Sequence, residues 1–112
     1  MSTDPLVPLG VLEEQVLVAV LRAQEEAYGM EVRRVIELAT GRDLAIGAVY
    51  ATLDRLEQKK LLTSRRTRGE GPTRRQFALT ARGAKVLMET RAMRERLWAG
   101  ALELLQLRVL RT

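Results

Sequence analysis

The 112-residue sequence contains no cysteine and no histidine. It therefore has no disulfides, no thiolate or imidazole metal ligands, and no side chain that ordinarily exchanges protons near neutral pH. Catalysis would be left to carboxylates, which are expected at exposed helical positions and at a helix end: Glu13, Glu14, Glu25 and Glu26. We therefore expect no enzymatic activity, no metal and no cofactor.

Aromatic residues are also scarce, at 4% of the chain against 46% hydrophobic residues. The core must then be built from aliphatic side chains, and the length suits one domain, which usually takes roughly 100 to 200 residues. Long apolar runs are missing as well, since none approaches the roughly 18 residues that a membrane span needs. No basic start leads into an apolar segment at the N-terminus. We expect a cytoplasmic protein with no membrane contact.

Hydrophobic spacing predicts three helices in the first half of the chain. Apolar residues recur every three or four positions in residues 11–24, 30–40 and 46–60, with glycines at positions 29 and 41 between the first two patterns and at the end of the second. The expected inward-facing residues are Leu12, Val16, Leu17, Val20 and Leu21, then Met30, Val32, Val35, Ile36 and Ala39, then Ile46, Val49, Leu53 and Leu56.

The second half predicts a β-hairpin and a long helix. Residues 61–68 and 73–79 are two short runs on either side of a Gly-Pro loop, as in a hairpin. Thr80 is a candidate N-cap, because its hydroxyl can accept a bond from a free amide in the first helical turn. A single helix is expected over residues 81–110, with Ala84, Leu87 and Met88 on the core side.

This order of elements predicts a mostly α chain with a small β-hairpin, of the α+β class: a winged helix-turn-helix followed by a long C-terminal helix. Residues 1–8 hold two prolines and are expected to form a flexible N-terminal arm. Residues 9–80 would form the winged helix-turn-helix, and residues 81–112 a dimerisation helix.

The net charge of +5 is concentrated in the hairpin, where residues 65–75 hold five arginines against one glutamate. A loop of this composition can grip a phosphate backbone, although a single arginine is more often a solvated surface charge. The exposed side of the third helix begins with small residues, which would let its backbone approach the floor of a DNA major groove. The candidate DNA contacts are Gly47, Ala48, Tyr50, Ala51, Thr52, Arg55, Arg65, Arg66, Arg68, Arg74 and Arg75.

Three residues of the third helix have competing interpretations. Tyr50 lies at the edge of the polar side, where it would either touch DNA or cap the core. Glu57 is expected to pair with a nearby arginine. Asp54 would face phosphates or base acceptors, unless it accepts a bond from a cytosine amino group or pairs with Arg55 or Gln58, and the sequence suggests no firm role for it.

The C-terminal helix becomes apolar on several sides after residue 96, more than a small domain can cover. An exposed patch of this kind usually marks an interface. We expect a two-fold homodimer that places two recognition helices in successive major grooves, about 34 Å apart. The expected interface residues are Leu97, Trp98, Ala101, Leu102, Leu105 and Val109. Trp98 would either pack in this interface or stack on a small hydrophobic or aromatic effector.

Three segments, AYGMEV, GAVYATLDRLEQKKLL and RRQFALTARGAKVL, occur in this order. Together they resemble the PadR family of bacterial transcriptional regulators over roughly residues 9 to 90, in its short type with a single C-terminal dimerisation helix. The resemblance implies a homodimeric repressor, released by an effector or other signal, whose Tyr50 and neighbouring residues touch DNA. Three residues depart from the family pattern: Ala51 replaces a frequent proline, Lys60 a glycine, and Phe77 a tyrosine.

The sequence therefore predicts a transcriptional regulator, associated with the nucleoid, that binds a palindromic operator in double-stranded DNA. The alternative is a winged-helix protein-interaction module, which would bind a protein partner and have only unselective affinity for DNA. Steep salt dependence combined with preference for one sequence separates the first from the second.

Overall fold

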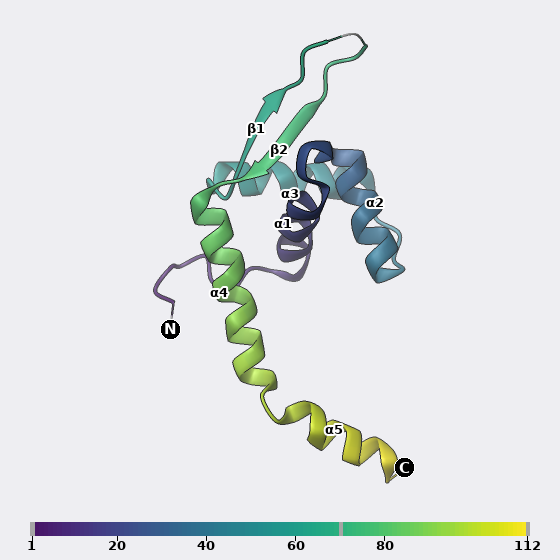
Figure 1. Ribbon diagram of the computed structural model, residues 1–112, viewed down its shortest axis with the longest axis vertical. Helices are drawn as coiled ribbons and strands as arrows, with labels where there is room; N and C mark the ends of the chain where they lie inside the picture. Colours follow the sequence, from purple (N-terminus) through teal and green to yellow (C-terminus); the bar gives the residue numbers. More distant parts are fainter. Residues whose placement is uncertain (1, 70, 112) are drawn as a thin grey trace.

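The computed structural model describes residues 2–69 and 71–111 (Figure 1). Met1, Glu70 and Thr112, which belong to the predicted arm, hairpin loop and C-terminal helix, lie outside the described residues. The elements are α1 (Val11–Ala23), the 3-10 turn η1 (Gln24–Glu26), α2 (Gly29–Thr40), α3 (Ile46–Gln58), β1 (Leu62–Arg66), β2 (Arg75–Leu79), α4 (Ala81–Trp98) and α5 (Ala101–Leu110). Helices with one antiparallel hairpin confirm the predicted fold class.

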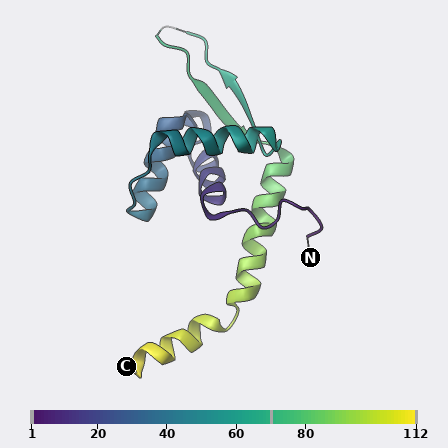
Figure 2. The same cartoon turned by 180° about the vertical axis from the view of Figure 1, so that it is seen from behind.

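Helix α1 is the central element, since α2, α3, β2 and α4 all contact it. The hairpin projects from one side of this helical body; α4 starts at the base of the hairpin, runs past α1 in the other direction and leads to α5 beyond the body (Figures 1 and 2). The buried core is aliphatic except for Phe77, whose ring is 1% exposed and anchors β2 against the helices. The Phe77 amide also donates to the Ala27 carbonyl at 2.9 Å. The replacement of tyrosine by phenylalanine therefore keeps the ring that holds the hairpin to the body.

Four residues expected in the core are exposed instead: Leu21 by 56%, Met30 by 59%, Met88 by 72%, and Ala39. The inward face of α4 is formed by Gly83, Val86 and Thr90, one position off the expected pattern. The spacing of apolar residues shows that a helix is amphipathic. It does not separate an apolar side chain at the margin of the core from one that is fully buried, because both recur every three or four residues.

The start of α4 is fastened to the turn that follows α3. The Thr80 hydroxyl accepts from the Gly83 amide at 2.9 Å, which confirms the predicted N-cap, and donates to the Lys60 carbonyl at 2.7 Å. The Thr80 amide donates to the Leu61 carbonyl at 3.1 Å. A Cβ built on Gly83 would lie 2.0 Å from that same carbonyl oxygen, so only glycine fits here.

The turn between α3 and β1 forms although a lysine occupies the position of the family's glycine. Helix α3 ends at Gln58 rather than at the predicted residue 60, and Lys60 adopts φ +62°. This left-handed conformation costs a residue with a side chain roughly 1 to 2 kcal/mol, because Cβ crowds the following carbonyl oxygen. The strands are also shorter than predicted. Their ladder runs from the pair Leu62 and Leu79, next to the helices, to the pair Arg66 and Arg75.

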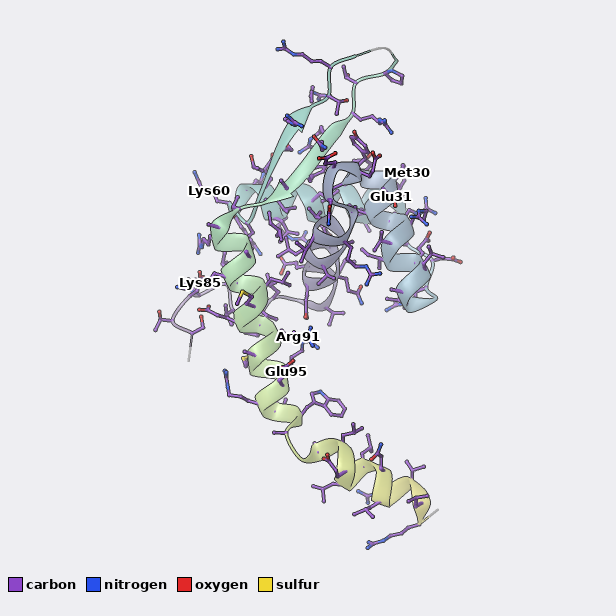
Figure 3. All side chains as sticks on the ribbon, in the orientation of Figure 1. Met30, Glu31, Lys60, Lys85, Arg91 and Glu95 are labelled. Atoms are coloured by element: carbon purple, nitrogen blue, oxygen red, sulfur yellow. The ribbon has the colours of Figure 1, made fainter. Side chains whose placement is uncertain are left out.

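The prediction of one helix over residues 81–110 is wrong. Helix α4 ends at Trp98, and α5 begins at Ala101 after Gly100, which has φ +76°. A glycine tolerates this conformation, and it redirects the chain at the end of α4. In Figure 3 the side chains of α5 project on all sides with no other element beside them. No described residue of α5 is buried.

The N-terminal segment, expected to be a flexible arm, lies against α4 over its described residues. The Asp4 carboxylate pairs with Arg82 at 3.2 Å, and Leu6 and Val7 pack against the core. The Leu9 amide donates to the buried Thr90 hydroxyl at 3.1 Å. Among the described residues, no helix combines the length and apolarity needed to cross a lipid bilayer.

We expect Gly83→Ala to destabilise the fold by about 1 to 3 kcal/mol, because the added methyl group collides with backbone that cannot move aside cheaply. Urea unfolding followed by circular dichroism measures this loss. Gly47→Ala is the matched control, since a Cβ there meets nothing within 4 Å. It should hold or raise stability, because alanine favours helix. Equal unfolding midpoints for Gly83→Ala and the unmodified chain would contradict the close contact.

Candidate nucleic-acid interface

Helix α3 presents a face of small residues to solvent at its N-terminal end. Gly47, Ala48 and Ala51 are all exposed, as predicted, and no atom lies within 4 Å of the position that a Cβ on Gly47 would take. Val49 and Leu53 face inward and are fully buried. The helix is therefore held by its apolar side, while a surface without large side chains is left open to a partner.

The prediction that Thr52 belongs to this exposed face is wrong. Thr52 is 1% exposed, and its hydroxyl donates to the Ala48 carbonyl at 2.8 Å. It lies three residues after Val49 and four before Leu56, so it shares their inward side of the helix. Its bond to the preceding turn satisfies the hydroxyl inside the core, and its side chain does not reach the surface.

Tyr50 lies between the core and the surface, where it covers part of α2 and keeps one edge exposed; its predicted contact with DNA stays a prediction. Its side chain is 38% exposed, and its ring lies against the start of α2. A Cβ built on Gly29 would lie 2.4 Å from Tyr50 Cζ and 2.6 Å from the hydroxyl oxygen. Gly29, interpreted from sequence only as a helix break, therefore makes room for the tyrosine. The hydroxyl end of Tyr50 therefore lies against Gly29, at the junction of α2 and α3.

Four of the five predicted hairpin arginines are exposed: Arg65, Arg66, Arg68 and Arg74. The Arg74 guanidinium lies over the Tyr28 ring, 4.1 Å from its centroid, in a cation–π contact. Arg65 donates to the Gln76 side chain at 2.8 Å. The guanidinium groups of Arg66 and Arg68 form no ion pair or hydrogen bond with the residues that the structure describes, and both residues are exposed.

Arg75 differs from the other four. Its guanidinium pairs with Asp54 at 2.7 Å and with Glu57 at 3.4 Å, and lies 4.8 Å from the centroid of the Phe77 ring. The hydrogen bond that Arg75 donates to the Asp54 carboxylate raises the pKa of Arg75 above its ordinary value. The expected pairing of Glu57 with an arginine is confirmed. The partner of Asp54 is neither Arg55 nor Gln58 but an arginine 21 residues further along.

The C-terminal end of α3 is tied to α1 by a second ionic group. Glu13 accepts from Lys59 at 2.8 Å and lies 3.7 Å from Arg55. Burial raises the pKa of Glu13, but the bonds from Lys59 and from the Gly10 amide outweigh it and leave the pKa below its ordinary value. Glu13 and Glu14 are mostly covered, contrary to expectation, and Glu14 pairs with Arg94.

A cleft of about 720 Å³ separates α2 from the hairpin. Its lining includes Tyr28, Met30, Tyr50, Arg66 and Arg74, so it joins the start of α3 to the basic wing. Figure 3 shows Met30 and Glu31 at the end of α2 nearest the hairpin. The Glu31 carboxylate is paired with Arg34, which offsets its charge at this end of the helix.

The predicted interface residues lie on the last turn of α4 and on α5. All are exposed except the partly covered Ala101, with Leu97 at 81%, Trp98 at 52% and Leu102 at 50%. Leu105 and Val109 continue the apolar surface along α5. Trp98 borders a hollow of about 540 Å³ between α1 and α4, lined also by Val18, Leu21, Leu87 and Met88.

Comparison with known proteins identifies the family. The model of the transcriptional regulator PadR-like family matches residues 16–89. A PadR-like transcriptional regulator from Bacillus cereus is 28% identical and superposes with a TM-score of 0.72, covering 87% of this chain and 93% of its own. A PadR family transcriptional regulator from Eggerthella lenta is also 28% identical, with a TM-score of 0.65 and coverage of 85% and 88%.

Bacillus subtilis PadR, solved in complex with operator DNA, shares the fold at 20% identity and a TM-score of 0.58, over 72% of this chain and 46% of its own. No curated protein matches the chain. The family match extends from α1 to α4 and includes every element of the candidate interface. This chain belongs to the PadR-like family, and it is a transcriptional regulator rather than an enzyme.

Proposed function

We propose that this regulator binds a palindromic operator in double-stranded DNA as a homodimer and represses transcription from it. The observation that carries the proposal is the placement of a small-residue helix face beside a projecting, arginine-rich hairpin. A major groove admits a helix whose exposed residues are small, and phosphates on either side attract unpaired cations. The operator complex of Bacillus subtilis PadR supports this use of the shared fold.

Within the proposed complex, residues of the interface divide by what they can contact. Gly47, Ala48 and Ala51 allow close approach to the groove floor, and the exposed edge of Tyr50 can meet base edges or phosphates. Arg55 lies 3.7 Å from Glu13 and would have to leave that carboxylate to reach a phosphate. The exposed wing arginines bind the backbone, where affinity carries no sequence information. Thr52 supports the helix from inside. The selective contacts therefore come from the first two turns of α3, while the wing supplies attraction common to all duplexes.

The homodimer is supported by the apolar surface of Leu97, Trp98, Ala101, Leu102, Leu105 and Val109. Monomeric proteins rarely expose a continuous apolar surface of this kind. A two-fold axis through α5 would make the surface self-complementary and would present two copies of α3 to one face of the DNA. Recognition helices spaced by one helical turn, about 34 Å, would read the two halves of a palindrome.

Release by a small hydrophobic or aromatic effector completes the proposal. The hollow beside Trp98 lies between α1 and α4, and its lining joins an apolar part, formed by Val18, Leu21, Leu87, Met88 and Trp98, to a charged rim of Glu14, Arg91, Arg94 and Glu95. The apolar part could hold the ring of such a molecule. A ligand there would shift the equilibrium only by binding one arrangement of the protein more tightly than the other. The regulator would act at the nucleoid, in the cytoplasm.

We expect Arg66→Ala combined with Arg68→Ala to weaken binding to all duplexes alike and to reduce the slope of log K against log salt by about two units, because two phosphate contacts are lost. Fluorescence anisotropy at several salt concentrations measures both quantities. The control is Arg96→Ala with Arg111→Ala, which removes the same charge from α4 and the end of α5. An unchanged slope in the wing variant would overturn the role of the wing. Wild-type binding that any competitor removes equally would favour the protein-interaction module.

We expect Leu102→Glu to split the dimer, because it would place an unpaired charge inside an apolar interface. Analytical ultracentrifugation at micromolar concentration should show a monomer for this variant and a dimer for the unmodified protein. Leu38→Glu is the control, since Leu38 is 72% exposed on α2, away from the predicted interface. A dimer that survives Leu102→Glu would show that α5 is not the contact.

A further inference from the structure

The last pair of residues in the hairpin is electrostatically unfavourable by itself. Arg66 and Arg75 are Cα partners at the end of the ladder, so two guanidinium groups start from directly opposite positions. Like charges placed opposite one another destabilise a strand pair. Arg66 remains exposed, but the side chain of Arg75 is only 29% exposed and turns to the acidic pair on α3.

The acidic pair consists of Asp54 and Glu57, which lie three residues apart on one side of α3. One terminal nitrogen of Arg75 donates to Asp54 and the other to Glu57. Glu57 also accepts from the Ser64 hydroxyl of β1 at 2.9 Å. Both strands are thereby attached to α3, β1 through Glu57 alone and β2 through Asp54 and Glu57. We call this group of four residues, Asp54, Glu57, Ser64 and Arg75, the wing clamp.

Several properties separate the wing clamp from an ordinary surface ion pair. The guanidinium is planar, it is held above the Phe77 ring at 4.8 Å, and it bridges two acceptors on another element. Its contribution to stability should still be small, because Asp54 is 54% exposed and solvent screens the pair. Its effect should therefore be on the orientation of the hairpin rather than on whether the chain folds.

The position of the clamp explains why orientation matters. Residues 67–69 and 71–74 follow the last rung of the ladder. They include the exposed Arg68, whereas the Arg74 guanidinium returns to the Tyr28 ring at the start of α2. A small rotation at the base of the hairpin displaces its tip by more than its base. The tip can meet phosphates beside the groove only if the angle between α3 and the hairpin matches the duplex.

We propose that Asp54 and Arg75 are positioning residues, which set the angle between the recognition helix and the wing and so determine operator selectivity without touching DNA. This inference rests on the proposed DNA-binding function. It gives Arg75 a role different from that of the four exposed wing arginines, and it gives a function to an acidic residue on a face that approaches phosphates.

For operator affinity, the proposal predicts a change in the opposite direction to the one that charge alone predicts. Removing an anion from a DNA-facing surface, and freeing an arginine beside it, should by charge alone strengthen binding to every duplex. If Asp54 positions the wing, Asp54→Asn should instead weaken operator binding by roughly threefold to tenfold, the range typical of coupled ionic networks. Affinity for a scrambled duplex should hold or rise, so the ratio of the two affinities should fall.

The DNA experiment uses a duplex selected by the unmodified protein from a random library, and a scrambled duplex of the same composition. Asp43→Asn is the charge-matched control, because Asp43 is exposed and has no ion pair among the described residues; it should leave the ratio of the two affinities unchanged.

Arg75→Gln should lower operator affinity with little change in salt slope, whereas Arg66→Gln should lower the slope by about one unit. Asp54→Asn added to Arg75→Gln should cause no further loss. Parallel strengthening on both duplexes by Asp54→Asn would overturn the proposal.

A second readout needs no DNA. Because the chain has no cysteine, Thr73→Cys and Leu38→Cys can carry a pair of spin labels on the hairpin and on α2, with unlabelled protein in excess so that one protomer is measured. Asp54→Asn should broaden the distance distribution, and Asp43→Asn should not. An unchanged distribution would overturn the proposal. Failure of the unmodified protein to prefer any selected duplex would instead overturn the proposed function.

Discussion

The architecture depends on one backbone carbonyl, that of Leu61. It accepts the amide of Thr80 at 3.1 Å, and it lies so close to Gly83 that no side chain fits between them. The end of α3, both ends of the hairpin and the start of α4 therefore meet within a few residues. Phe77 closes the same junction from inside the core. The recognition helix, the wing and the helix that leads to the apolar C-terminus are consequently fixed to one rigid point.

Some basic residues of this chain form ion pairs within the protein and others face solvent, and the amino-acid composition does not distinguish the two groups. Arg75, Arg55 and Lys59 contact carboxylates of the same protein, and they hold α3 to the wing and to α1. Arg66 and Arg68 have no such partner among the described residues. An ion pair within the protein adds little stability near the surface. The arginine or lysine in such a pair is, however, already neutralised and attracts a polyanion such as DNA less strongly. The positive charge that this surface offers to a polyanion is therefore lower than a count of its arginines suggests.

Sequence patterns predicted most of the fold, because amphipathic spacing, the Gly-Pro loop and the Thr80 cap are local signals. These patterns gave no indication of contacts between residues that lie far apart in the sequence. Nothing near Asp54 indicates an arginine 21 positions away, and nothing near Gly29 indicates the ring of Tyr50. Thr52 looked exposed because its hydroxyl is polar, although a bond to Ala48 satisfies it inside the core. The break after Trp98 was missed because helix-forming residues stand on both sides of Gly100.

That break makes the direction of α5 a property of a single residue. Gly100 takes a conformation that a residue with Cβ resists. With a helix-forming residue in its place, residues 81–110 would favour one continuous rod of about 45 Å, at 1.5 Å per residue. The apolar surface would then face a different way relative to the basic one. One substitution at Gly100 can thus redirect the apolar surface of α5 while the sequence of α3 and of the hairpin stays the same.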